Sequence, residues 1–141
     1  MNFPKELKYS KTHEYQKLLP NNLAIVGITS YASSELGDVV YVELPEPGRT
    51  FKAGEKFGVI ESVKSVSELY LPNDGKIMAV NKELNEHPEY VNQDTYEKGW
   101  MLKIELTTDL NKNKELISSE EYSKFVTCGA HWDPVPLRKE N

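Results

Sequence analysis

Cysteine is nearly missing from this chain of 141 residues, in which Cys128 is the only one. A single thiol excludes an internal disulfide and a cysteine-based zinc cluster, and it agrees with a reducing compartment. Basic residues are outnumbered as well, since 17 Lys and Arg stand against 22 Asp and Glu and give a formal net charge of -5. They are dispersed rather than gathered into a stripe, so we expect no nucleic-acid partner.

Long apolar runs and common catalytic motifs are also missing. No segment approaches the roughly 20 apolar residues that span a bilayer, so we expect no membrane partner. Residues 1–6 lack an apolar core and include Glu6, so they resemble neither a secretory signal nor an intact transit peptide. Phosphate-cradling glycine loops and a serine nucleophile elbow are absent. His13 and His87 lack metal-ligand spacing, and we expect both to be structural.

The chain does contain a series of short strand-like runs separated by turn formers, within a length that fits one domain. The runs cover 14–19, 23–28, 38–44, 57–62, 66–71, 76–80 and 100–106. Many short strands with turns between them predict a mainly-β sandwich or flattened barrel. In 38–44 the alternation predicts that Val40, Val42 and Leu44 share one buried face.

Two helices are predicted from their capping residues. Ser30 can cap a short internal helix, which Gly37 would end by adopting a left-handed conformation. Further along the chain, Ser118 and Glu121 have capping-box spacing. They predict an amphipathic helix near the C-terminus.

These elements place the expected domain at 1–126 and leave 127–141 without a usable periodicity. Cys128 and His131 in this tail suggest a catalytic thiol or a metal site. Two ligands cannot close a zinc site, however, and the only nearby acid that could orient the histidine is Asp133. A flexible or docking tail is therefore the favoured interpretation.

A faint internal repeat frames the middle of the chain. The segment 44–48 (LPEPG) recurs 27 residues later as 71–75 (LPNDG), so two strand-then-turn units could be related by a pseudo-two-fold axis. We expect Gly48 and Gly75 at turns where a positive φ favours glycine. Chance remains an alternative, because such dipeptides are common at turns. Lys64 lies between the two segments.

Lys64 occupies the predicted tip of the hairpin formed by 57–62 and 66–71. A lysine there projects its amine into water from a rigid base, which suits covalent attachment better than acid–base catalysis. Taken alone, an exposed lysine is more often ordinary solvated surface.

Several ordered stretches, spread over about residues 8–126, give the chain a resemblance to a known family. The stretches are HEY (13–15), VGIT (26–29), LGDVVYVELP (36–45), FGVIESVKS (57–65), VN (91–92) and YEKGW (96–100). Together they resemble the H-protein family of the glycine cleavage system, a relative of biotinyl/lipoyl carrier domains. The resemblance implies a lipoyl-domain fold, a hybrid of flattened barrel and sandwich, and a non-catalytic carrier.

The resemblance implies that Lys64 receives lipoate through an amide bond. Biotin carriers set their lysine between methionines, whereas Lys64 lies between Val63 and Ser65, which favours lipoate. Glu61 matches the family's acid and would help a lipoylating enzyme recognise the hairpin. The alternative for Glu61 is a solvent-facing strand residue.

The family works as a relay between enzymes. A glycine decarboxylase, the P-protein, loads an aminomethyl group, and an aminomethyltransferase, the T-protein, passes the one-carbon unit on. Dihydrolipoamide dehydrogenase, the L-protein, then reoxidises the lipoyl dithiol. Tethering raises the effective concentration of the cargo at each enzyme. We expect these partners and a monomeric chain.

The family also shields its cargo in a cleft of the carrier, where a cationic group needs a carboxylate partner. Residue-by-residue matching implies Glu14 and Glu68, with Thr12 as a hydroxyl contact. The alternative is that all three are surface polar residues on strands. Tyr15 replaces the tryptophan usual after His-Glu, an aromatic exchange that packing tolerates.

Two other functions stay open: a lipoyl carrier serving different enzymes, and an unmodified adaptor that keeps only the fold. The bare N-terminus fits a bacterial cytoplasm, while a mitochondrial matrix location fits a chain from which a transit peptide has been removed.

Overall fold

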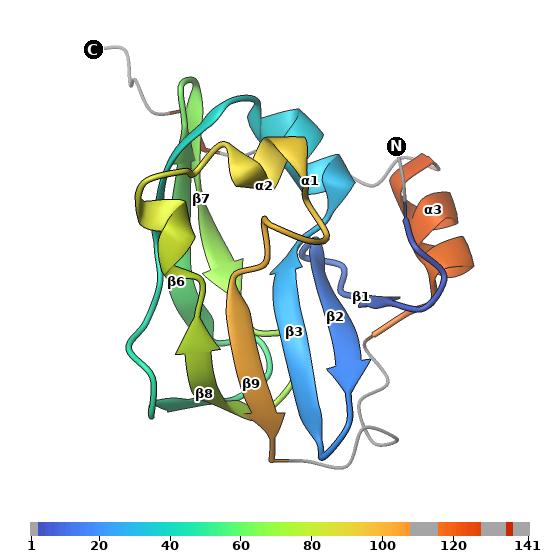
Figure 1. The fold of residues 1–141 in the computed structure, drawn as a ribbon. Helices are drawn as coiled ribbons and strands as arrows, with labels where there is room; N and C mark the ends of the chain where they lie inside the picture. Colours follow the sequence, from blue (N-terminus) through green and yellow to red (C-terminus); the bar gives the residue numbers. More distant parts are fainter. Residues whose placement is uncertain (1–2, 108–115, 128–134, 137–141) are drawn as a thin grey trace.

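Two antiparallel β-sheets pack face to face in the computed structural model, which describes residues 3–107, 116–127 and 135–136 (Figure 1). The first sheet has the strand order β1-β2-β3-β9-β8-β5. Its strands are β1 (Lys8–Tyr9), β2 (Glu14–Leu19), β3 (Leu23–Ile28), β9 (Leu102–Leu106), β8 (Gly75–Val80) and β5 (Thr50–Phe51). The second sheet, of order β10-β7-β6-β4, contains β10 (Val135–Pro136), β7 (Ser65–Tyr70), β6 (Lys56–Ser62) and β4 (Val39–Glu43). The predicted mainly-β flattened sandwich is confirmed.

The core lies between the two sheets, where alternate strand residues point inward. Ile60 and Leu69 from the second sheet, and Ile77 and Ile104 from the first, are each 1% exposed or less. They belong to one continuous apolar cluster that also includes Leu36 of the first helix. The predicted strands 14–19 and 23–28 match β2 and β3, and the other predicted strands agree within two residues at either end.

Short helices close one end of the sandwich and a longer one lies at its side. A 3-10 helix (Lys82–Asn85) and the helices α1 (Ser30–Leu36) and α2 (Tyr90–Gln93) cover the end, whereas α3 (Ser119–Thr127) lies beside β1 (Figure 1). Among the described helices, none is long and apolar enough to cross a membrane.

The structure confirms the predicted capping box of α3 and moves the predicted N-cap of α1 by one residue. Glu121 N–H donates to Ser118 Oγ and Ser118 N–H donates to the Glu121 carboxylate, both at 3.2 Å, which is the expected capping box. Helix α1, however, is capped by Thr29, whose hydroxyl accepts from the backbone of the third residue on at 3.2 Å. The prediction of Ser30 was wrong because its hydroxyl instead accepts from Tyr96 at 3.0 Å.

Strand β4 corrects the predicted alternation. The pairing of β4 with β6 shifts register between Val39 and Tyr41, which is the signature of a β-bulge. Val39 and Val42 are therefore the buried residues, each 3% exposed, while Val40 is 49% exposed. The predicted face of Val40, Val42 and Leu44 was wrong for Val40, because an extra residue in one strand reverses the pattern beyond it.

The two segments of the internal repeat lie near each other in the structure, but their glycines differ in backbone conformation. Gly48 has a φ of 99° and its N–H donates to the Ile77 carbonyl at 2.7 Å, which brings the first segment beside β8. Gly75 is the first residue of β8 and is not among the residues with positive φ. A Cβ there would lie 2.9 Å from the Ile104 side chain, so close packing, not a turn, explains this glycine. The pseudo-two-fold axis stays a prediction.

The C-terminal tail contributes one described element. Strand β10 pairs antiparallel with β7, where Val135 lies opposite Val66 and residue 136 opposite Ser65. Residues 128–134 and 137–141, including Cys128 and His131, lie outside the described residues. The domain boundary at 126 stays a prediction. Elsewhere, in the part of the chain that the structure describes, no three metal-ligating side chains come together.

An aromatic cluster attaches α3 to the first sheet. Tyr122 stacks on Tyr9 with ring centroids 4.8 Å apart, and its hydroxyl lies 2.6 Å from His13 Nδ1. Burial lowers the pKa of His13 to about 4, so its ring is neutral at neutral pH. His87 lies on the surface, 3.0 Å from Glu89. Both observations agree with structural roles for the two histidines.

Candidate functional site

Lys64 lies at the exposed tip of the β6–β7 hairpin, as predicted. The turn is held by Ser62, whose buried Oγ accepts from the backbone N–H groups of Ser65 at 3.0 Å and Lys64 at 3.3 Å. A serine hydroxyl that bonds the backbone two or three residues on replaces the glycine that such turns often use. An exposed amine therefore projects from a fixed base.

A glycine provides space for the Lys64 side chain. Gly37 ends α1 with a φ of 81°, a conformation that side chains rarely adopt. A Cβ at Gly37 would lie only 3.2 Å from Cε of Lys64, so the lysine methylenes pass over this backbone. The next residue, Asp38, accepts a hydrogen bond at 3.0 Å from Val63 N–H through its carbonyl. The hairpin tip thus leans on the loop between α1 and β4.

Asn92 fixes this loop from the side of α2. Its amide donates to the Gly37 carbonyl at 2.7 Å and to the Ser33 hydroxyl at 3.1 Å, and its oxygen accepts from Val39 N–H at 2.8 Å. One side chain thereby joins α1, the loop and the first residue of β4. The surface beneath Lys64 is consequently ordered by hydrogen bonds as well as by packing.

Glu61 lies one strand position from the turn, half-buried on β6. It is opposite Tyr41 on one side and Val66 on the other. It lies three residues before Lys64, close enough for a protein that binds the hairpin to contact both residues. The alternative of a plain solvent-facing residue stays open.

The other predicted site residues lie at the far end of β7. Glu14 is 1% exposed, and its carboxylate accepts hydrogen bonds from the hydroxyls of Thr12 and Ser10, the latter at 2.8 Å. Its second oxygen accepts from Tyr70 N–H at 3.2 Å. Because Glu14 belongs to the first sheet and Tyr70 to the second, this carboxylate joins the two sheets.

Burial controls the charge of Glu14. The lost hydration raises its pKa to about 7, and the hydrogen bonds from Thr12, Ser10 and the Tyr70 backbone limit that rise because they favour the charged form. A carboxyl group with this pKa changes charge near neutral pH. It can therefore pair with a cation at modest cost or remain neutral when no cation is present.

Glu68 stands apart from that cluster. Its carboxylate accepts from the Tyr70 hydroxyl at 2.6 Å and forms an ion pair with Lys56 at 3.4 Å, with about half of its side chain exposed. The hydrogen bond from Tyr70 and the neighbouring Lys56 hold its pKa below the usual range. Tyr70 is therefore the link between the two acids: its backbone binds Glu14 and its hydroxyl binds Glu68.

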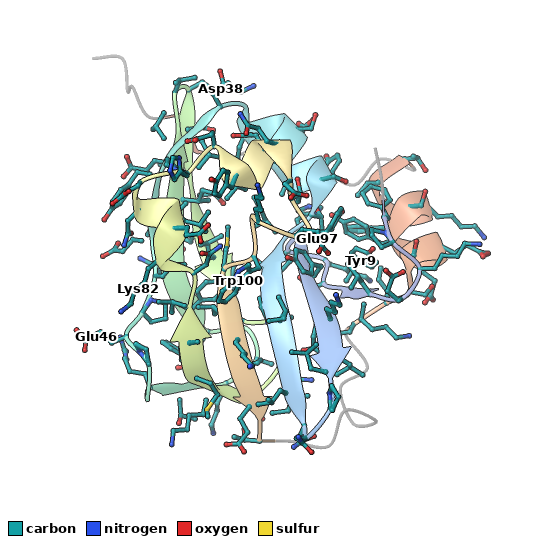
Figure 2. The ribbon with its side chains drawn as sticks, viewed as in Figure 1. Tyr9, Asp38, Glu46, Lys82, Glu97 and Trp100 are labelled. Carbon is teal, nitrogen blue, oxygen red and sulfur yellow. The ribbon has the colours of Figure 1, made fainter. Side chains whose placement is uncertain are left out.

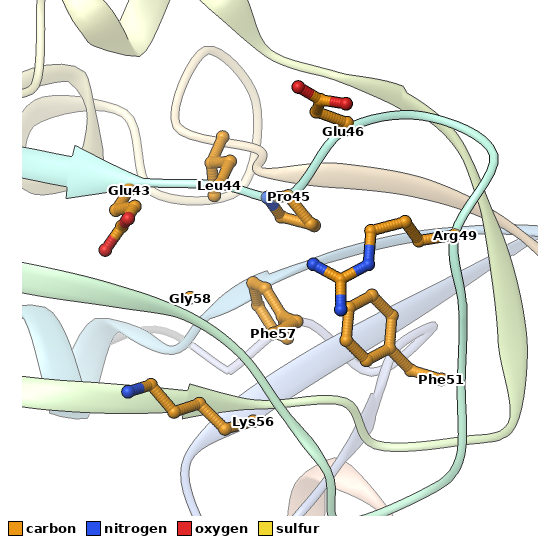
Figure 3. A pocket seen from close by; sticks show the side chains of 9 residues that line it. All are labelled: Glu43, Leu44, Pro45, Glu46, Arg49, Phe51, Lys56, Phe57 and Gly58. Atoms are coloured by element: carbon orange, nitrogen blue, oxygen red, sulfur yellow. The ribbon is translucent and has the colours of Figure 1, made fainter.

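One pocket borders these residues, and a second lies apart from them. One of about 400 Å³ is lined in part by Ser10, Thr12, Leu71 and Ile117, beside the Glu14 carboxylate. Another of about 430 Å³ lies between β4, β5 and β6, where Arg49 stacks over Phe51 (Figure 3). None of the predicted site residues lines the second pocket, so it is separate from the candidate site.

The structure thus forms two clusters rather than one. Lys64 and Glu61 lie at one end of β7, and Glu14 and Thr12 lie at the other, about 17 Å along the strand at ~3.3 Å per residue. A long flexible group on Lys64 would be needed to join them.

Sequence reasoning missed four residues of these clusters. Ser62, Asn92, Ser10 and Tyr70 each hold a functional candidate in place through hydrogen bonds. For Ser62 a signal existed, because the tip lacks Gly and Pro and needs another turn former. Asn92 and Tyr70 act across long sequence separations, which no local pattern reveals, whereas Ser10 lies only four residues before Glu14.

Comparison with known proteins identifies relatives over nearly the whole chain. The family model described as Glycine cleavage H-protein matches residues 7–128. A protein named glycine cleavage system H protein from Staphylococcus epidermidis is 53% identical over 126 residues, which covers 89% of this chain and 98% of that protein. One of the same name from Anoxybacillus flavithermus is 52% identical with the same coverage. The crystal structure of a glycine cleavage system H protein from Mycobacterium marinum has 36% identity and a TM-score of 0.80, covering 88% of this chain and 98% of that one.

Proposed function

Because the chain belongs to the glycine cleavage H-protein family, we propose that Lys64 is its lipoate attachment site and that it carries the aminomethyl group of glycine. Members of this family are lipoate-bearing carriers of glycine cleavage rather than catalysts. The finer proposal is that the cargo passes from the P-protein to the T-protein, and that electrons then pass to the L-protein. The observation that carries the proposal is the exposed Lys64 amine on a turn held by Ser62.

The residues of the hairpin suit amide formation. In that step Lys64 Nζ, after losing a proton, attacks the activated carboxyl carbon of lipoate, and the activating nucleotide leaves as the amide bond forms. Lys64 supplies an accessible nucleophile, and Ser62 and Asn92 hold its base. For Glu61 we propose recognition by the lipoylating enzyme. When bound, lipoate supplies a reversible dithiol–disulfide couple that accepts the one-carbon unit.

For the Glu14 cluster we propose a role in shielding the cargo. Glu14 would pair with the cationic amine, and Thr12 would orient the carboxylate through its hydroxyl. Glu68 would act at the rim, where it fixes the Tyr70 ring. A loaded Glu14→Gln carrier is expected to lose its cargo to water faster than a loaded Glu68→Gln carrier. Equal loss rates would remove Glu14 from this role.

Intact-mass spectrometry tests the attachment. The chain would be incubated with a lipoylating enzyme, lipoate and ATP, alongside Lys64→Ala and, as matched control, Lys82→Ala on the exposed 3-10 helix (Figure 2). The lipoyl mass is expected on the unaltered chain and on Lys82→Ala, and not on Lys64→Ala. A lipoyl mass that survives Lys64→Ala contradicts the assignment.

Reconstitution tests the finer proposal. The lipoylated chain, P-protein and glycine are expected to exchange labelled carbon dioxide with the carboxyl group of glycine. Absence of exchange with fully lipoylated protein would favour a lipoyl carrier that serves other enzymes. The curated relatives named above are bacterial, and we propose the cytoplasm of a bacterium as the location.

A further inference from the structure

Exposed apolar side chains gather beside the Lys64 hairpin. Val40 and Tyr41 on β4 are each 49% exposed, and Val63 at the tip is 64% exposed. Among the described residues, only Leu18 and Met78 are other large apolar side chains with comparable exposure. Three of five such side chains therefore belong to one small region of the second sheet, and neither the core nor the turn requires them to be apolar.

The bulge in β4 produces this arrangement. Val39 and Val42 point into the core, so the extra residue between them leaves Val40 and Tyr41 on the outside. Tyr41 lies opposite Glu61, and Glu61 lies opposite Val66, which makes a cross-strand row next to the tip. Val40 and Tyr41 are thus held by a sheet, and Val63 by the turn that joins β6 to β7.

Acidic side chains predominate among the described residues around these groups. Residues 30–48 contain four acids and no Lys or Arg. Asp38 lies beside the tip, because its carbonyl accepts from Val63 N–H, and Figure 2 shows it at that end of the molecule. Glu61 and the exposed Glu43 belong to the adjacent outer rows. Lys64 is the cation at the tip, while Glu43 also borders Lys56 and Arg49 in the pocket between β4, β5 and β6 (Figure 3).

We infer that Val40, Tyr41 and Val63, rimmed by Asp38, Glu43 and Glu61, form a docking face for the enzyme that acylates Lys64. This inference rests on the proposed attachment at Lys64 and extends it from one lysine to a surface. A flexible lysine cannot be distinguished from other lysines by its amine alone, so selection needs rigid neighbouring groups. The complementary enzyme surface would be apolar at its centre and carry Lys or Arg at its rim.

Steady-state kinetics of lipoylation test the apolar part. The variants are Tyr41→Ser and Val63→Ser, with Leu18→Ser and Met78→Ser as controls of similar exposure on the first sheet. Each face variant is expected to raise KM for the carrier about tenfold at unchanged kcat, as for loss of an interface anchor. Both controls should keep the original KM, and thermal unfolding should confirm that all four fold.

A charge reversal tests the rim. Glu43→Lys is expected to raise KM for the carrier and to weaken the dependence of this KM on salt concentration. Glu105→Lys, at an exposed position on β9, should change neither the KM nor its salt dependence. Equal KM values for face and control variants would overturn the docking face while leaving attachment at Lys64 intact. A chain that takes no lipoyl mass at all would overturn both proposals.

Two other occupants would also overturn the inference. If the unmodified chain dimerises in sedimentation experiments and Tyr41→Ser makes it monomeric, a second copy covers the face. If Tyr41→Ser is lipoylated normally but slows carbon dioxide exchange with the P-protein, the face belongs to that partner instead.

Discussion

The two ends of β7 treat an ionisable group in opposite ways. At the hairpin, Lys64 extends into water while buried groups around Ser62 order only the backbone beneath it. At the other end, the Glu14 carboxylate is itself buried and is reached by hydroxyls and a backbone N–H. Under the proposed function, one end would present a nucleophile to other proteins and the other end would accept a charge away from water. Such a carrier would use both, and the strand keeps them at a fixed separation.

The largest expected effect concerns the buried end. A pKa of about 7 for Glu14, against an ordinary 4.5, means that the folded state binds this proton more tightly than the unfolded state. The stabilisation is full below about pH 4.5 and is lost as the pH rises to about 7, by about 3 kcal/mol. Glu14→Gln, which resembles the protonated acid, should remove this slope in denaturant titrations across that range.

Two comparisons make the result specific to Glu14. Glu68→Gln should retain the slope, because that acid is exposed. Protonation of His13 in the unfolded state lowers the stability of the protein as the pH falls from about 6.5 to about 4. Subtracting the stability–pH curve of Glu14→Gln from that of the unaltered chain cancels this opposite contribution. If the unfolding free energy of Glu14→Gln changes with pH as much as that of the unaltered chain, Glu14 does not take up a proton on folding.

A smaller effect is expected at the turn below Lys64. Ser62→Ala removes the acceptor for two backbone N–H groups and should cost about 2 kcal/mol of unfolding free energy. Ser67→Ala, whose hydroxyl bonds only the next residue's carbonyl, should be close to neutral. Chemical denaturation measures both costs, and amide hydrogen exchange at Ser65 should accelerate only in Ser62→Ala. Unchanged exchange would mean that packing alone orders the tip.

The smallest expected effect concerns two glycines with positive φ, of which only Gly37 lies against the Lys64 side chain. Gly37→Ala and Gly54→Ala place a side chain at φ values of 81° and 86°, so each should cost about 1 kcal/mol. Space is open around Gly54, whereas a Cβ at Gly37 meets the Lys64 side chain. Only Gly37→Ala should therefore slow lipoylation, measured by intact mass over time. Equal slowing of lipoylation in both variants would show that the contact between Gly37 and the Lys64 side chain has no specific effect.

The sequence predicted the fold well where local chemistry decides it. A β-branched run after Pro20-Asn21-Asn22 defines β3, and β2 pairs with it as the predicted hairpin. Gly37 ends α1 with the expected positive φ, although its ψ of -156° is not that of the left-handed helical region. The cap of α1 was misplaced by one residue, because Thr29 and Ser30 offer the same hydroxyl and only the distant Tyr96 decides between them.

The candidate site was harder to predict in full. Lys64 follows from its position between two strands and from the family resemblance. The grouping of Glu14 with Thr12 agrees with expectation, but Glu68 binds Tyr70 and Lys56 instead of joining them. Period-two patterns also cannot reveal the bulge at Val40, because an inserted residue is defined only by the partner strand.

That bulge has a further consequence at the boundary of the second sheet. β4 is an outermost strand, and a regular outermost strand offers evenly spaced N–H and C=O groups on which another chain can assemble. The inserted residue interrupts this spacing, which discourages growth of the sheet from one molecule into the next. Strand pairing between copies of the chain is thereby disfavoured, even though apolar side chains are exposed on β4.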